Sequence, residues 1–136
     1  GSTERTARVI RVLHLEDNVI DGEALRACFD AGGIAASVER VAGHPLFADA
    51  LASRRFELIL LDYRAAEGGL FALTIARGLA PDTPVIVVSD ELGEERAVEV
   101  LKRGAADCVR KERLDTLPVT VTRALRDAEE YQQALT

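Results

Sequence analysis

A short, wholly apolar run that ends on an acid most constrains the fold of this chain. Leu58, Ile59, Leu60 and Leu61 are followed directly by Asp62. Four large aliphatic residues in a row are too few for a helix and lack polar alternation, so they predict a strand buried on both faces, as in a parallel sheet. Ligands of such sheets collect beyond the carboxyl ends of the strands, and Asp62 is therefore a candidate functional residue.

The rest of the chain predicts strands and helices in alternation. Apolar runs at 8–15, 37–41, 58–61, 85–88 and 106–109 predict strands, the most apolar of them at the centre of the sheet. Apolar residues at helical spacing predict helices at 24–31, 45–52, 70–79, 94–103 and 114–128. Each parallel crossover needs a helix, and right-handed crossovers cover both faces, so the pattern predicts an α/β doubly wound parallel sheet.

Length and composition indicate a single domain. The chain has 136 residues, of which 48% are hydrophobic, enough for one core and too few for two ordinary domains.

Its net charge of −6 and its dispersed basic residues argue against nucleic acid or an anionic membrane as a partner. No run approaches the ~20 apolar residues of a membrane span and the N-terminus lacks an apolar signal core, so a cytoplasmic location is expected.

Some side chains have predicted positions. In the helix at 94–103, Ala97, Val98 and Leu101 are expected to face inward. His14 lies inside the first strand and His44 lies in a loop before a proline. Neither histidine has partners at ligand spacing, so both are interpreted as structural or exposed.

Polar side chains follow four of the predicted strands at one end of the sheet. Glu16 and Asp17 come after the first strand, Asp62 after the third, Ser89 after the fourth and Lys111 after the fifth. An acid or a serine taken alone could simply cap a helix, but their common position favours a site. Crowded carboxylates repel each other unless a cation joins them, which favours a hard divalent ion with oxygen ligands, best Mg²⁺.

This set of side chains suits phosphoryl chemistry. A carboxylate such as Asp62 can attack phosphorus and form an acyl phosphate when the charge of the transferred group is neutralised from several sides. The metal would take one phosphoryl oxygen, the Ser89 hydroxyl a second and the Lys111 ammonium a third. Lys111 is one of two lysines in a chain that otherwise uses Arg, which indicates a need for a compact charge. Arg64 lies two residues after Asp62. Two roles remain open for it: a surface charge, or a gatekeeper over the phosphoryl site.

The sequence resembles the receiver domain of two-component response regulators over nearly its whole length and in the family's order. The matching stretches are 15–18 (LEDN) with Asp21, 60–64 (LLDYR), 85–89 (VIVVS), 93–98 (GEERAV) and 104–111 (GAADCVRK). The resemblance implies that residues 3–136 form a single domain with a flavodoxin-like (βα)5 fold and strand order 2-1-3-4-5. This domain would end in a long C-terminal helix. Gly1 and Ser2 are interpreted as the remnant of a removed tag, and the chain as a piece of a larger protein.

The resemblance also implies a function. Asp62 would be the phosphoacceptor, and Ser89 and Lys111 would be the switch pair. Mg²⁺ or Mn²⁺ would be held by oxygen ligands from Glu16, Asp17, Asp62 and the backbone carbonyl of Arg64. A histidine kinase or phosphotransfer protein would supply the phosphoryl group, and an output domain or a second copy would be a further partner. The domain would not be a conventional enzyme.

Three positions depart from the family pattern. Cys108 stands where the family has an aromatic ring three residues before the lysine, so we expect activation to move Ser89 and its loop without a large side-chain swing. Asp90 stands where a small residue is usual, and its charge should repel an incoming phosphoryl group. The loop 65–69 lacks the family's proline and is one residue short, which predicts a looser carbonyl ligand near Arg64.

Other functions are weighed against this one. A receiver-like scaffold that binds partners without phosphorylation is favoured by the three departures and opposed by the intact strand-end residues. A phosphatase of the haloacid dehalogenase type would need a second Asp two residues after Asp62, where Arg64 stands. No Gly-rich loop with Lys-Ser or Lys-Thr follows a strand, which argues against a P-loop. Flavin binding is disfavoured because acids rather than hydroxyls follow the first strand.

Overall fold

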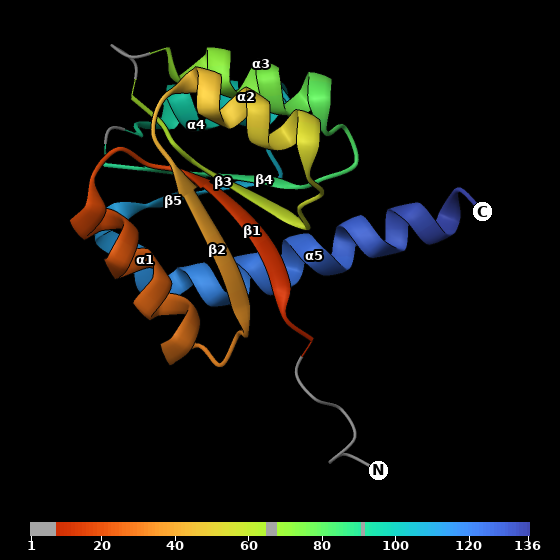
Figure 1. The fold of residues 1–136 in the computed structure, drawn as a ribbon, viewed down its shortest axis with the longest axis horizontal. Coiled ribbons are helices and arrows are strands. Elements are labelled where there is room, and N and C mark those ends of the chain that lie inside the picture. Colours follow the sequence, from red (N-terminus) through yellow and green to blue (C-terminus); the bar gives the residue numbers. More distant parts are fainter. Residues whose placement is uncertain (1–7, 65–67, 91) are drawn as a thin grey trace.

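Strands and helices alternate along the chain (Figure 1), as described by a computed structural model for residues 8–64, 68–90 and 92–136. The change expected in the loop 65–69 therefore falls largely outside the described residues. The strands are β1 (Ile10–Leu15), β2 (Ala36–Val41), β3 (Leu58–Asp62), β4 (Val85–Ser89) and β5 (Asp107–Arg110). The helices are α1 (Val19–Ala31), α2 (His44–Ser53), α3 (Gly69–Leu79), α4 (Glu94–Lys102) and α5 (Leu117–Ala134), with the 3₁₀ segment η3 (Lys111–Thr116) before α5.

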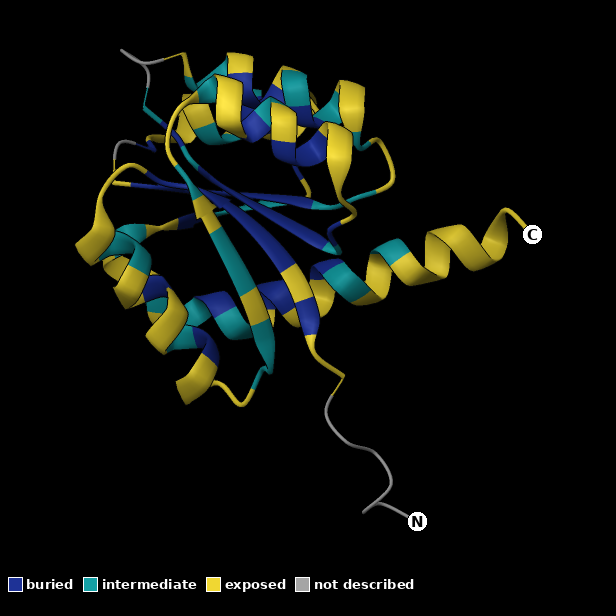
Figure 2. Cartoon of the chain, viewed as in Figure 1, coloured by how far each residue is buried: buried dark blue, intermediate teal, exposed yellow. Residues whose placement is uncertain are grey.

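All of these strands pair in parallel in one sheet of order β2-β1-β3-β4-β5, which confirms the flavodoxin-like topology. The central strands β3 and β4 are almost entirely buried, whereas β2 at the edge is half-buried or exposed (Figure 2). The sequence explains this difference. Unbroken aliphatic runs tolerate burial on both faces, but Ser37, Glu39 and Arg40 in β2 require contact with water.

Helices cover both faces of the sheet. α2, α3 and α4 lie on one face, and α1 and α5 lie on the other (Figure 1). Alternate residues of each strand enter different cores. Ile59 and Val87 pack in the core under α2, α3 and α4, and Leu60 and Val88 pack in the core under α1 and α5. Within the described part of the chain, no helix has both the length and the apolar character needed to cross a bilayer.

The pairing register aligns the strand ends on which the candidate site depends. Leu15 of β1 pairs with Leu61 of β3, so Glu16, which follows β1, and Asp62, the last residue of β3, come side by side. Asp62 pairs with Val88 of β4, which places Ser89 one residue further along. Ser89 pairs with Arg110 of β5, so Lys111 leaves the sheet at the same edge. The predicted convergence of these residues at one edge is therefore built into the sheet.

Two side chains of α4 lie elsewhere than expected. Val98 and Leu101 are 50% and 43% exposed, whereas Val100 is fully buried. Ala97, half-buried, and Val100 stand three residues apart and form the inward stripe of this short helix. The prediction that Val98 and Leu101 face inward is wrong because a nine-residue helix touches the sheet along one narrow stripe only.

Candidate functional site

The carboxylate of Asp62 lies between two cationic side chains. Its side chain, at the end of β3, is 6% exposed. Lys111 Nζ lies 3.1 Å from one carboxylate oxygen, Oδ1, and Arg64 Nε donates a hydrogen bond of 2.8 Å to the other, Oδ2. Both oxygens of the candidate acceptor therefore face a positive charge.

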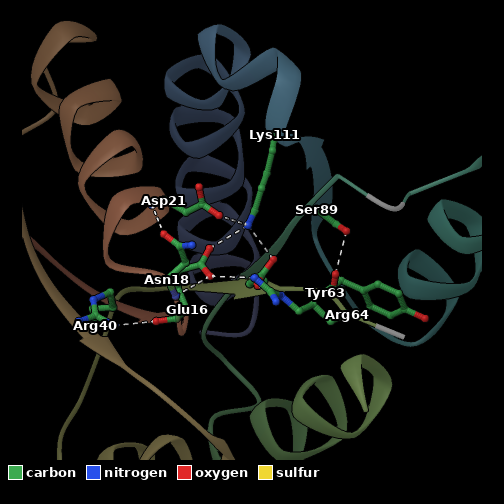
Figure 3. Close-up of polar contacts among 9 residues, drawn as sticks. Glu16, Asn18, Asp21, Arg40, Tyr63, Arg64, Ser89 and Lys111 are labelled. Carbon is green, nitrogen blue, oxygen red and sulfur yellow. Dashed lines mark hydrogen bonds and ion pairs between the residues drawn. The ribbon is translucent and has the colours of Figure 1, made fainter. Parts of the chain in front are cut away.

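Lys111 is held by three acids from different parts of the chain. It opens η3 directly after β5, and its Nζ also donates to Asp21 Oδ2 at 2.9 Å and to Glu16 Oε1 at 3.0 Å (Figure 3). Burial opposes the charge of the ammonium, but the hydrogen bonds to Asp21, Glu16 and Asp62 outweigh it and raise the pKa of Lys111. The amine is therefore a fixed positive charge at the sheet edge.

Glu16 is the most deeply buried acid of the group, with 1% of its side chain exposed. Besides Lys111, it accepts a hydrogen bond of 3.2 Å from the Asn18 backbone N–H, and Arg64 Nη2 lies 3.8 Å from its Oε2. Burial raises the pKa of Glu16 above its ordinary value, while the Lys111 and Asn18 hydrogen bonds pull it down. The loss of either cation would thus leave a costly buried charge.

The site contains residues that strand-end reasoning missed. Asp21 bonds Lys111 from the first turn of α1, where Asn18 Oδ1 accepts from the Asp21 backbone N–H at 3.0 Å and caps the helix. The sequence signal was its place four residues after Asp17 at the start of a helix. Arg40 of β2 donates to the Glu16 carbonyl at 2.8 Å. Its sequence position on an edge strand gave no such signal.

A cleft of about 210 Å³ opens beside these acids. Its lining includes Glu16, Asp62, Arg64 and the exposed Asp17. His44 also lines it, from the first turn of α2, and packs edge-on against the Phe71 ring at 5.1 Å. Because His44 follows β2, whose carboxyl end reaches the same edge, the strand-end rule could have found it.

Ser89 and Tyr63 connect the end of β4 with α4. The Ser89 hydroxyl is buried and donates a hydrogen bond of 2.8 Å to the Tyr63 carbonyl. The Tyr63 ring is buried against Gly69, and its hydroxyl accepts a hydrogen bond of 3.2 Å from Arg96 of α4. A movement of Ser89 would therefore act directly on the backbone next to Asp62. Cys108, on β5, is a half-buried free thiol.

His14 is a buried histidine of β1 that is influenced by the charges of the site. It is 1% exposed, and its Nδ1 has no hydrogen-bond partner among the residues that the structure describes. Burial lowers its pKa to about 4; Asp62 acts in the opposite direction, and Lys111 and Arg40 add to the lowering. The imidazole is therefore neutral at physiological pH, and its interpretation as a structural residue agrees with its burial.

The donor set suits a hard divalent ion. Glu16, Asp17 and Asp62 supply carboxylate oxygens to one cleft, the ligand type that Mg²⁺ and Ca²⁺ prefer. Among the described residues, however, no three acidic, histidine or cysteine side chains are arranged as ready metal ligands. The reason is visible in Figure 3, where Glu16 is turned toward the cations Lys111 and Arg64. The carboxylate oxygens are therefore suitable ligands for a divalent ion, but the contacts of Arg64 with Glu16 and Asp62 would have to rearrange when the ion binds.

A parallel sheet of order 2-1-3-4-5 with acids, a serine and a lysine at its carboxyl edge is typical of a domain of the receiver class. Comparison with known proteins agrees with this class. The transcriptional regulatory protein ZraR of Salmonella typhimurium is 33% identical over 126 residues, which make up 89% of this chain and 27% of ZraR. No family model matches the chain.

Solved structures share the fold. The crystal structure of a signal receiver domain from Vibrio parahaemolyticus has a TM-score of 0.80 at 20% identity, covering 93% of this chain and 98% of that one. A second similar structure is a Burkholderia pseudomallei response regulator with a phosphorylated aspartic acid, a calcium ion and citrate. Its TM-score is 0.71 at 21% identity, and the match covers 93% of this chain and 73% of the Burkholderia chain. The chain therefore resembles the receiver domains of two-component response regulators in its fold, and it resembles part of a response regulator in its sequence.

Proposed function

We propose that this chain is a phosphoacceptor, in which Asp62 takes a phosphoryl group from a phosphohistidine donor with the help of a divalent ion. The observation that carries the proposal is the position of the Asp62 carboxylate, between Lys111 at 3.1 Å and Arg64 at 2.8 Å, at the edge of an acidic cleft. A phosphoryl group arrives with negative charge, so cations that already surround its acceptor stabilise the transition state.

The residues have separate roles in this proposal. Asp62 attacks phosphorus and forms the acyl phosphate, while the leaving imidazole of the donor departs with the electron pair of the broken bond. Lys111, held by Asp21 and Glu16, keeps its ammonium beside the new phosphoryl oxygens. Ser89 exchanges its Tyr63 carbonyl for a phosphoryl oxygen, which would relay the change to Arg96 and α4 through Tyr63. Since Cys108 replaces the family's aromatic ring, no ring rotation takes part.

The proposed metal ligands are the oxygens of Glu16, Asp17 and Asp62 together with the backbone carbonyl of Arg64. When bound, Mg²⁺ or Mn²⁺ neutralises the charge of the transferring group. The Arg64 carbonyl accepts a hydrogen bond of 3.1 Å from the Gly69 N–H, and a carbonyl oxygen has two lone pairs. The calcium ion in the Burkholderia relative supports a divalent ion in this class of domain.

The experiment that tests the function is radiolabelling from acetyl phosphate and from a phosphohistidine donor, with Mg²⁺ and with EDTA. Wild-type protein should incorporate label only with Mg²⁺, and Asp62→Asn should lower incorporation by about 100-fold or more because the amide is not a nucleophile. Asp90→Asn, the same substitution at a position that does not accept the phosphoryl group, is the control for folding and should not lower incorporation. Failure of the wild type to label, and to respond to beryllofluoride with Mg²⁺, would favour the scaffold hypothesis instead.

Asp90→Ala should speed labelling by acetyl phosphate about threefold, because an exposed carboxylate beside the site repels the incoming dianion by less than ~1 kcal/mol. The rate should be measured at low and high salt, since the gain should shrink when salt screens the charge. An equal rate in the two proteins would show that Asp90 does not control access.

The partners follow from the same proposal. The chain spans 27% of ZraR, which leaves room for an output domain beyond the receiver in a protein of that kind. A histidine kinase or phosphotransfer protein would be the donor, a second copy of the chain a further partner, and the cytoplasm the location. The acyl phosphate would be hydrolysed slowly in place, so the domain would not be an enzyme in the ordinary sense.

A further inference from the structure

The strongest unexplained feature of the site is the position of the Arg64 guanidinium. Its Nε donates to Asp62 Oδ2 at 2.8 Å, and its Nη2 lies 3.8 Å from Glu16 Oε2 (Figure 3). One planar cation thus faces two of the three acids that are proposed to hold the divalent ion. Lys111 occupies the other oxygen of each of these acids.

The two cations differ in how firmly they are held. The Lys111 side chain is 15% exposed and bonds three carboxylates, so it is fixed among the acids. The Arg64 side chain is 37% exposed and reaches the acids from the solvent side of the cleft that it lines. A long side chain at the edge of a cleft can turn outward without disturbing the core.

An ion and the guanidinium need the same oxygens. Mg²⁺ binds carboxylate oxygens at about 2.1 Å in octahedral geometry and repels a nearby cation. Arg64 lies at hydrogen-bond distance from Asp62 Oδ2 and near Glu16 Oε2, the oxygens that are not bonded to Lys111. Binding of an ion between Asp62 and Glu16 would therefore require Arg64 to leave.

We propose, on the basis of the proposed function, that Arg64 is an internal competitor of the divalent ion, which pairs with Asp62 and Glu16 until the ion displaces it. The competition lowers the affinity of the site for Mg²⁺. It also keeps the buried acids neutralised when the ion is scarce, since an unpaired buried carboxylate is strongly unfavourable. Arg64 is thus a positioning residue that sets the metal concentration at which the domain becomes competent.

The test is the dissociation constant of Mg²⁺ measured by isothermal titration calorimetry for wild type, Arg64→Gln and Arg64→Lys. Arg64→Gln should bind Mg²⁺ about fivefold to tenfold more tightly, because it removes one charge-assisted contact to a metal ligand. Arg64→Lys should fall between the two, since lysine keeps the charge and lacks the planar fork.

The matched control is Arg40→Gln. Arg40 also lies at the site, but it donates to the Glu16 backbone carbonyl rather than to a carboxylate, so the affinity should change less than twofold. A second readout is thermal unfolding in EDTA and in saturating Mg²⁺. Arg64→Gln should lower the melting temperature in EDTA and show a larger rise on addition of Mg²⁺ than wild type does.

The outcomes separate this inference from the proposed function. If wild type binds Mg²⁺ and is labelled at Asp62, but Arg64→Gln binds Mg²⁺ with equal or lower affinity, the competition is refuted and the phosphoacceptor function stands. If neither protein binds Mg²⁺, the metal site and the competition both fail. An affinity gain of equal size in Arg40→Gln would refute a specific role for Arg64 and indicate general electrostatics.

Discussion

Replacing Lys111 with methionine should lower the free energy of unfolding by about 3 kcal/mol near neutral pH, because it leaves buried carboxylates without their ammonium partner. Lys111 bonds Glu16 and Asp62, whose side chains are 1% and 6% exposed. Methionine keeps most of the apolar stem, so the loss should report the charge rather than a cavity. Urea denaturation gives the value directly.

The effect of Lys111→Met should shrink as the pH falls. Burial holds the pKa of Glu16 above its ordinary value of 4.5, and removal of the ammonium would raise it further. A carboxyl with a raised pKa in the folded state takes up its proton there first, so the folded state gains stability as pH falls through that pKa toward 4.5. A loss of equal size at all pH values would contradict the assignment of the effect to Glu16.

The second lysine of the chain provides the control for Lys111→Met. Lys102 is exposed at the end of α4. Lys102→Met should change the free energy of unfolding by no more than about 0.5 kcal/mol, as surface substitutions usually do. If both variants lose stability equally, the three-acid network around Lys111 does not account for its contribution.

Acidification from about pH 7.5 to about pH 5 should destabilise the folded protein through His14 by about 2 kcal/mol. The pKa of His14 is lowered from 6.5 to about 4 in the folded state, chiefly by burial. As pH falls below 6.5, His14 binds a proton in the unfolded chain, whereas the buried imidazole of the folded protein stays neutral. The folded state therefore loses stability between pH 6.5 and about 4. Above pH 6.5 the contribution is fully present.

Comparison of His14→Leu with wild type isolates this effect. The variant lacks the titrating ring, including the Nδ1 that has no hydrogen-bond partner in the described part of the chain, so its free energy of unfolding should fall less than that of wild type between the two pH values. Val12→Ala, at another buried position of β1, should lower stability equally at both pH values and serves as the packing control. Parallel pH dependence of wild type and His14→Leu would contradict a depressed histidine pKa.

The residue pattern was sufficient for the parallel sheet and for most of the strand-end residues, and the resemblance to a known family supplied the strand order. The uninterrupted aliphatic runs at β3 and β4 define central parallel strands, and the residues that follow such strands must gather at one edge. This logic predicted that Glu16, Asp62 and Lys111 would meet, and the carboxylates of Glu16 and Asp62 both lie within hydrogen-bond distance of the Lys111 ammonium. It also located Ser89 at the end of β4.

The same logic did not identify a site residue inside a helix, and it did not predict which face of a short helix packs against the sheet. Asp21 contacts Lys111 from the first turn of α1, and periodicity alone did not select it as a site residue. The inward face of α4 was predicted to contain Val98 and Leu101 instead of Val100, because a short helix with several apolar residues leaves its rotation undetermined. Packing against the sheet chose the stripe that fits.

By itself the sequence determined the order of the elements and the chemistry gathered at the carboxyl edge, because both depend on local pattern and on the geometry of parallel strands. Only the tertiary structure decided which cation neutralises which acid. Arg64 could have pointed into solvent, but residues 16 and 62 come from neighbouring strands and bring two carboxylates within reach of its guanidinium. Ion pairing is a property of distances in space, which no spacing along the chain encodes.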